Sequence, residues 1–306
     1  MSKGGSGVER KRRIRKILSA VSIIIAVNLL VGFLSTKLVY DSVFKRYDGE
    51  ADEGFALLCE TGERSYFPSG DNMLCSYFFD TEGDTLVVVA LGMNTQMSEH
   101  TALVEGLIST ERDVFIFDMT GCGESEGESA KGFSQVHFDL NCALDYIESE
   151  YSYDSIFLLG HSRGGYGAVS VLSERDDVTA VASVSAPNSP MEAVIGSSVQ
   201  RIGGAAYANY PMLYLYQTML FDRETVSLSC ADIIESTSVP VLVVHGTDDS
   251  EIPTEKYSLY SYRREVRREG VEFVEISGDH GSVLDTREMI NIADEFFCKY
   301  SEKGGE

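Results

Sequence analysis

The chain has 306 residues, which is enough for one large domain or two small ones. Hydrophobic residues make up 43% of it and aromatic residues 10%, so it can bury a globular core. The formal net charge of −23 makes nucleic acid and other polyanions unfavourable partners for the main body.

The N-terminal segment differs from the rest of the chain. Residues 10–16 carry a cluster of Lys and Arg, residues 17–34 are free of charge, and the next charged residue is Lys37. This pattern predicts a basic cytoplasmic tail without regular structure over 1–16 and a transmembrane signal anchor over 17–40, with the remaining chain outside. A cleaved signal peptide is the alternative, but the apolar run is longer than a usual signal-peptide core and lacks a small-residue cleavage site. The predicted location is therefore the cell membrane, with a single span and an extracytoplasmic catalytic domain.

Downstream of this segment, strand and helix patterns alternate. An acidic stretch over 41–63 is expected to be a linker or a docking segment, followed by a catalytic domain over 64–300. Apolar runs predict strands at 64–68, 73–79, 85–90, 113–118, 155–159, 178–184, 239–244 and 271–276, and helices are expected over 98–109, 133–151 and 287–300 and directly after Ser162. Alternation at this spacing predicts an α/β fold with a mostly parallel sheet and helices on both faces.

Residues 188–238 interrupt the alternation, since they are more than one crossover helix needs. This stretch is rich in Tyr and Met, and we expect it to form a small helical lid. Three of its side chains, Tyr207, Tyr214 and Met219, are candidates for lining an apolar substrate pocket. The alternative is that these side chains only pack the lid on the core.

The most informative motif follows the strand predicted at 155–159 and precedes a helix. It reads Gly160-His161-Ser162-Arg163-Gly164. In the G-x-S-x-G pattern between strand and helix, the Ser lies on a sharp, strained turn with its hydroxyl exposed at the edge of the sheet. Ser162 is therefore the candidate nucleophile.

A serine nucleophile needs a base and a carboxylate that orients the base. Two loops that follow predicted strands supply candidates: Asp248 and Asp249 in one, His280 in the other. Of the five histidines, His280 alone lies between a post-strand turn and the final helix. The chain order Ser162, Asp249, His280 is the order of the α/β-hydrolase class.

With these motifs the chain resembles the α/β-hydrolase superfamily, and within it the membrane-anchored bacterial serine hydrolases of the peptidase S33/Bem46-like group. The resemblance covers residues 64–300 and rests also on the loop that begins at His245 and on a D-x-x-G-x-G-x-S segment over 118–125. It implies Asp249 rather than Asp248 as the acid, and an oxyanion hole formed by the backbone N–H groups of Met93 and Arg163. It implies no metal and no organic cofactor.

Two positions depart from the family pattern. Leu91 stands where the family usually has His, and Arg163 follows the nucleophile where Met or Gln is common. The Arg163 side chain is expected either to form a salt bridge that holds the elbow or to favour an anionic substrate.

The resulting hypothesis is a serine hydrolase that cleaves a carboxylic ester or amide through an acyl-enzyme. Its partners would be a small-molecule or lipid-like substrate and, through the N-terminal helix, the membrane, but no nucleic acid. The same triad would serve a peptidase, an acyltransferase or a thioesterase. A hydrolase-fold binding module without catalysis is the alternative of another class.

Overall fold

One sheet of eight strands forms the centre of the computed structural model, which describes residues 5–301. The strand order is β1-β2-β4-β3-β5-β6-β7-β8. β2 runs antiparallel to β1 and β4, and all other neighbouring strands are parallel. This confirms the predicted α/β class and mostly parallel sheet. The strands are β1 (Glu63–Ser69), β2 (Asn72–Phe79), β3 (Thr85–Ala90), β4 (Asp113–Phe117), β5 (Ser155–His161), β6 (Ala180–Val184), β7 (Val241–Gly246) and β8 (Val271–Ile276).

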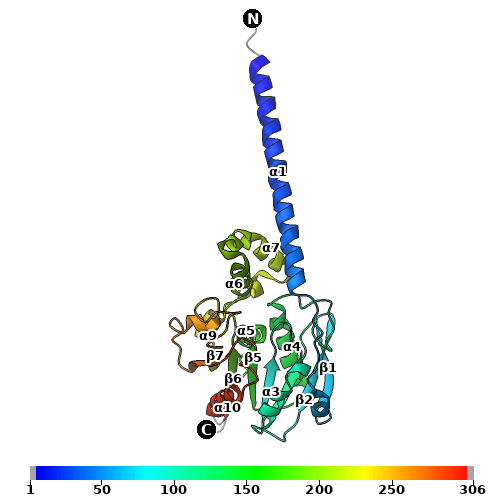
Figure 1. Ribbon diagram of the computed structural model, residues 1–306, viewed down its shortest axis with the longest axis vertical. Coiled ribbons are helices and arrows are strands. Elements are labelled where there is room, and N and C mark those ends of the chain that lie inside the picture. Colours follow the sequence, from blue (N-terminus) through cyan, green and yellow to red (C-terminus); the bar gives the residue numbers. More distant parts are fainter. Residues whose placement is uncertain (1–4, 302–306) are drawn as a thin grey trace.

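Helices cover both faces of the sheet (Figure 1). Their bounds are α1 (Gly5–Val43), α2 (Phe55–Cys59), α3 (Thr101–Ile108), α4 (Gln135–Glu150), α5 (Arg163–Ser170), α6 (Pro190–Ile202), α7 (Tyr210–Leu220), α8 (Arg223–Val226), α9 (Cys230–Ser236) and α10 (Arg287–Ser301). Short 3₁₀ helices lie at η1 (Met97–Glu99), η2 (Val171–Ser173), η3 (Gly203–Asn209) and η4 (Leu259–Tyr262). One apolar cluster joins the sheet to α4, α5 and α9, and a second joins it to α2, α3 and α10.

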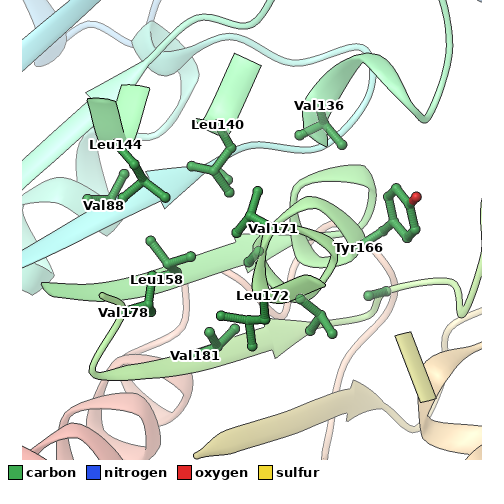
Figure 2. Close-up of a cluster of buried hydrophobic side chains, with 14 of the residues drawn as sticks. Val88, Val136, Leu140, Leu144, Leu158, Tyr166, Val171, Leu172, Val178 and Val181 are labelled. Carbon is green, nitrogen blue, oxygen red and sulfur yellow. The ribbon is translucent and has the colours of Figure 1, made fainter. Parts of the chain in front are cut away.

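The cluster beneath α4 explains why β3 and β5 are continuous apolar runs. Figure 2 shows Leu140 and Leu144 of α4 directed toward Val88 of β3 and Leu158 of β5. All four side chains are fully buried or nearly so. Because both faces of these strands are covered, neither strand needs a polar residue facing water. The centre of the sheet is therefore a rigid support for the loops at its carboxyl edge.

Helix α1 projects from the domain as a long rod (Figure 1). Among the described residues, one helix, Glu9–Val43, is long and apolar enough to cross a membrane. The mean hydropathy of its most apolar 18-residue stretch is 2.6, and no part of that stretch is buried in the protein. The helix includes the basic cluster, so the prediction of an unstructured tail there is wrong. Uncharged neighbours and the absence of Pro allow the helix to continue backward through the Lys and Arg residues, which are good helix formers.

The segment between α1 and β1 lies against the domain instead of hanging free. Arg46 donates to the backbone carbonyls of Ser125, Gly127 and Gly123. Single β-bridges join Lys45 to Ser129 and Tyr47 to Cys122. Phe55 of α2 packs edge-on against Tyr77 of the sheet. Of the two expectations for 41–63, a linker or a docking segment, the contacts match docking.

Residues 188–238 contain helices α6 to α9. In Figure 1, α6 and α7 lie beside the lower end of α1, above the body of the domain. Helix α9 is different, because its Cys230 and Ile234 are fully buried in the main core. The separate helical layer therefore comprises α6, η3, α7 and α8.

Candidate active site

The G-x-S-x-G motif forms a tight strand-to-helix turn. β5 ends at His161, α5 begins at Arg163, and Ser162 between them has φ 52° and ψ −116°. Such a backbone conformation is costly for a non-glycine residue and is typical of functional sites. A Cβ on Gly160 would lie 2.3 Å from the carbonyl oxygen of Gly164, and one on Gly164 would lie 1.9 Å from that of Ala90. Both glycines are therefore required by the close crossing of strand and helix.

Gly164→Ala should destabilise the protein and disturb the turn together, because the new methyl group meets backbone atoms that have no rotamer to change. We expect a loss of about 1–3 kcal/mol in the free energy of unfolding. Thermal unfolding of the full-length protein in detergent measures this. Gly281→Ala is the matched control, since a Cβ there meets nothing within 4 Å. Equal melting temperatures for the two variants would contradict the steric argument.

The three predicted triad residues come together at the carboxyl edge of the sheet. The Ser162 hydroxyl lies 2.9 Å from His280 Nε2, and His280 Nδ1 lies 2.7 Å from Asp249 Oδ2. The other carboxylate oxygen of Asp249 accepts hydrogen bonds from the backbone N–H groups of Glu251, at 3.0 Å, and Ile252, at 2.8 Å. Asp249 is buried, whereas Asp248 is exposed and its side chain accepts a hydrogen bond from the Thr247 hydroxyl. The carboxylate in contact with His280 is thus the one that was predicted.

The environment keeps Asp249 ionised. Burial alone would raise the pKa of its carboxyl group. The hydrogen bond and charge of His280 and the N–H group of Ile252 outweigh burial, so the pKa of Asp249 is lowered below its usual value. An ionised carboxylate accepts a hydrogen bond from Nδ1–H, which leaves Nε2 of His280 free to accept one from Ser162.

Two other histidines contact the backbone of the loops that carry His280 and Asp249. The His161 Nε2–H group donates to the backbone carbonyl of His280 over 2.6 Å. His245 Nε2 lies 2.8 Å from the carbonyl oxygen of Ile252, in the loop that carries Asp249, as expected from its place at a strand end. Burial, followed by the proximity of His280, lowers the pKa of His161 to about 3. Sequence reasoning missed the positioning role of His161, because its partner is 119 residues away in the chain.

Neutral, buried His161 should make the protein sensitive to acid. Its folded pKa, about 3, lies below the unfolded value of 6.5, so the unfolded chain takes up a proton first as pH falls. The contribution of His161 to the free energy of unfolding is therefore fully present above about pH 6.5. It declines by about 1.4 kcal/mol per pH unit as the pH falls toward about 3. His161→Gln, which keeps a donor but does not titrate, should flatten this dependence. Melting temperatures at pH 7 and pH 5 test it, and identical declines for variant and wild type would contradict it.

The loop after β3 lies against Ser162. A Cβ on Gly92 would lie 3.1 Å from His161 Nδ1 and 3.4 Å from Ser162 Cβ. The next residue, Met93, lines the cavity at Ser162. Arg163 is the first residue of α5, where N–H groups lack an intrahelical acceptor. Leu91, which replaces the usual His, is buried in the apolar core.

The D-x-x-G-x-G-x-S segment has a structural role. Asp118 accepts hydrogen bonds from the backbone N–H groups of Met97 and Glu124, and Ser125 donates to the carbonyl of Asp118. These bonds tie the loop after β4 to the loop after β3. Burial raises the pKa of Asp118 to about 6.

The Arg163 side chain points into the protein and is 1% exposed. Its Nη2 group lies 3.9 Å from the Cys122 sulfur, and its Nε group has no partner among the described residues. No carboxylate in residues 5–301 lies within ion-pair distance, so the predicted salt bridge is wrong. Nor does the side chain line the cavity at Ser162, which removes the basis for a contact with an anionic substrate. Burial raises the pKa of the neighbouring Cys122 thiol.

A cavity of about 870 Å³ opens at Ser162 and His280. From the lid it is lined by Ala206, Asn209 and Leu213, together with residues of α6. The three predicted lid contacts lie elsewhere, and this prediction is corrected: Tyr207 bonds to Tyr257, Tyr214 bonds to Arg223, and Met219 is 65% exposed. The reason is helical geometry, since the face of α7 that carries Leu213 turns Tyr214 and Met219 away from the cavity.

Comparisons with known proteins show which chains and folds this protein resembles. Residues 81–225 match the family model described as serine aminopeptidase, S33. The uncharacterized protein YfhR of Salmonella typhimurium is 29% identical over 196 residues, which are 60% of each chain, so the match spans about three fifths of that relative's length. Human monoglyceride lipase is 31% identical over 110 residues, 35% of this chain and 36% of the lipase. The Pyrococcus furiosus esterase Pf2001 superposes with a TM-score of 0.64 and 18% identity, over 84% of this chain and 98% of the esterase.

Proposed function

We propose that this chain is a serine hydrolase of the α/β-hydrolase superfamily and that it cleaves carboxylic esters. The observation that carries the proposal is the unbroken hydrogen-bonded series from the Ser162 hydroxyl through His280 to the buried Asp249 carboxylate. A fold that served only for binding would have no need of these three groups in this order. Ser162 acts as nucleophile, His280 as general base and acid, and Asp249 holds the imidazole and stabilises its charged form.

The reaction has two halves. His280 Nε2 takes the Ser162 proton as the oxygen attacks the ester carbonyl, and then gives that proton to the departing alcohol. Water, deprotonated by His280, attacks the resulting acyl-enzyme and releases the acid. The N–H groups of Met93 and Arg163 are proposed to bind the oxyanion in both halves. One such donor is worth about 3–4 kcal/mol of barrier in related chemistry.

Ester rather than peptide cleavage is supported by the composition of the cavity. The family model that matches is named for an aminopeptidase, and such an enzyme must recognise a substrate ammonium group. Among the described lining residues, Glu251 is the one carboxylate that could bind such a group. It lies 4.0 Å from His280 Nε2 and is thus beside the triad histidine. Most of the other lining residues are apolar or small. An apolar acyl group fits this cavity better than a charged amino terminus.

A direct comparison of substrates decides between the two activities. The full-length protein is assayed with p-nitrophenyl esters of increasing acyl length and with aminoacyl and peptidyl p-nitroanilides. We expect ester hydrolysis to dominate in kcat/KM. Faster cleavage of an aminoacyl anilide than of every ester would instead favour the peptidase.

We further propose that residues 17–40 anchor the protein with the N terminus in the cytoplasm. The support is the Lys and Arg cluster on one side of the apolar run, which by the positive-inside rule stays in the cytoplasm. Alkaline phosphatase, which is active only outside the cytoplasm, should be active when fused after residue 301. A stable fusion with an inactive phosphatase would show that the C-terminal domain lies in the cytoplasm and would contradict the proposed orientation.

A further inference from the structure

The anchor helix forms one wall of the catalytic cavity. The residues of this segment that line it are Gly32, Ser35, Thr36, Val39, Tyr40, Val43 and Phe44. Their spacing of three and four places them on a single face of the helix. Leu34 and Leu38, on other faces, are 47% and 71% exposed. The cavity that begins at Ser162 therefore extends beside this face of α1 as far as Gly32.

Specific contacts hold this part of α1 against the lid. The Thr36 hydroxyl lies 3.0 Å from the side-chain oxygen of Asn209, and the Tyr216 hydroxyl donates to Asp41 over 2.5 Å. The Tyr216 ring meets Phe33 and Tyr40 edge-on. These polar and aromatic contacts hold α1 and α7 together as one unit.

The position of Lys37 sets the depth of the cavity in a membrane. Residues 17–36 carry no charge. At 1.5 Å per residue they span about 30 Å, which is the thickness of the hydrocarbon layer. Lys37 then lies at the outer interface, and Gly32, five residues earlier, lies about 7 Å inside the hydrocarbon. The far end of the cavity is thus at the depth of lipid acyl chains, and the nucleophile is above it.

The lid presents a surface suited to the same interface. In a chain of net charge −23, residues 190–221 contain one acidic residue, Glu192. Large apolar or aromatic side chains are exposed on this layer: Ile202, Tyr207, Tyr210, Leu215, Met219 and Leu220. Tyr is enriched where proteins meet the headgroup region. Ile202 also lines the cavity, whereas the other five side chains do not, and those five are placed to contact the bilayer beside α1.

We propose that the anchor helix is a specificity-determining part of the substrate site, and that the substrate is a long-chain acyl ester resident in the outer leaflet. The ester would enter laterally from the bilayer at the Gly32 end of the cavity. Its acyl chain would lie along the face from Gly32 to Phe44, with the carbonyl at Ser162. This inference rests on the proposed esterase function and adds to it the source and chemical class of the substrate.

Gly32→Phe tests the proposal at the far end of the cavity. A Cβ at Gly32 meets nothing within 4 Å, so the ring can be accommodated and would fill space that the acyl chain needs. Ala26→Phe is the matched control, since Ala26 is exposed on the same helix and does not line the cavity. Ser35→Leu is a second lining variant, in which the lost side-chain bond is only to Val31 one turn earlier.

The full-length proteins are reconstituted in phosphatidylcholine vesicles and assayed with p-nitrophenyl palmitate and p-nitrophenyl butyrate. In Gly32→Phe and Ser35→Leu, we expect kcat/KM for palmitate to fall about tenfold or more relative to butyrate. Ala26→Phe should keep the wild-type ratio. An unchanged ratio in both lining variants, or an equal fall in Ala26→Phe, overturns the role of the helix. A wild type that cleaves neither ester overturns the esterase function itself, which is a distinct result.

Discussion

Ser162→Ala should reduce kcat for ester hydrolysis by about 10⁶, to the level left by binding and the oxyanion hole alone. Ser162 carries the one hydroxyl at the elbow that is hydrogen-bonded to His280. Without it no acyl-enzyme can form, and water has no positioned path to the carbonyl. The measurement is the initial rate with p-nitrophenyl butyrate, for the full-length protein in detergent.

A matched control separates chemistry from folding. Ser282→Ala removes a hydroxyl from the His280 loop that, among the described residues, accepts a hydrogen bond from the Asp279 N–H group alone. It should keep most of the wild-type rate. A Ser162→Ala variant that melts like the wild type and retains more than a few per cent of its rate would exclude Ser162 as the nucleophile.

Asp249→Asn should have the second largest effect, with a loss of about 10⁴ in kcat. The amide lacks the negative charge that stabilises the His280 imidazolium. It can also donate to Nδ1 and so favour the tautomer in which Nε2 cannot accept the serine proton. Because the side chain is nearly isosteric, KM should change much less than kcat.

The neighbouring carboxylate provides the control for this variant. Asp248→Asn makes the same chemical change one residue earlier, at an exposed side chain that does not contact His280. We expect its kcat to stay within about threefold of wild type, as for surface changes of at most 0.5 kcal/mol. A greater loss in Asp248→Asn than in Asp249→Asn would reverse the assignment of the acid.

Local patterns were sufficient to predict the elbow and the partners of Ser162. The glycines at 160 and 164 are needed wherever a strand and a helix cross so closely, so that motif carries its own geometry. Loops that follow parallel strands meet at one edge of the sheet, which brings His280 to Ser162 although they are 118 residues apart. The fold class followed from the same alternation of strands and helices.

Contacts between elements that the topology does not bring together were not predictable in this way. The composition of residues 188–238 indicates a lid, but the face of α7 that lines the cavity depends on how that helix packs against α1. For this reason Leu213 lines the cavity and Tyr214 does not. Hydropathy likewise predicts a span at residues 17–40 but carries no information about Tyr40, which lines the cavity that opens at Ser162.

The burial of Arg163 is a further example. Its charge suggested a partner carboxylate, and the structure instead places it beside Cys122 with no carboxylate in ion-pair range among residues 5–301. A sequence pattern cannot distinguish a long side chain that extends into solvent from one that folds back beneath the elbow.

The central claim is that Ser162 is an activated nucleophile, and active-site labelling tests it most directly. The full-length protein in detergent is treated with a fluorophosphonate, digested, and mapped by mass spectrometry. We expect one covalent adduct on the peptide containing Ser162, absent in Ser162→Ala and much slower to form in His280→Ala. No adduct on the folded wild-type protein, or an adduct that persists in Ser162→Ala, would contradict it.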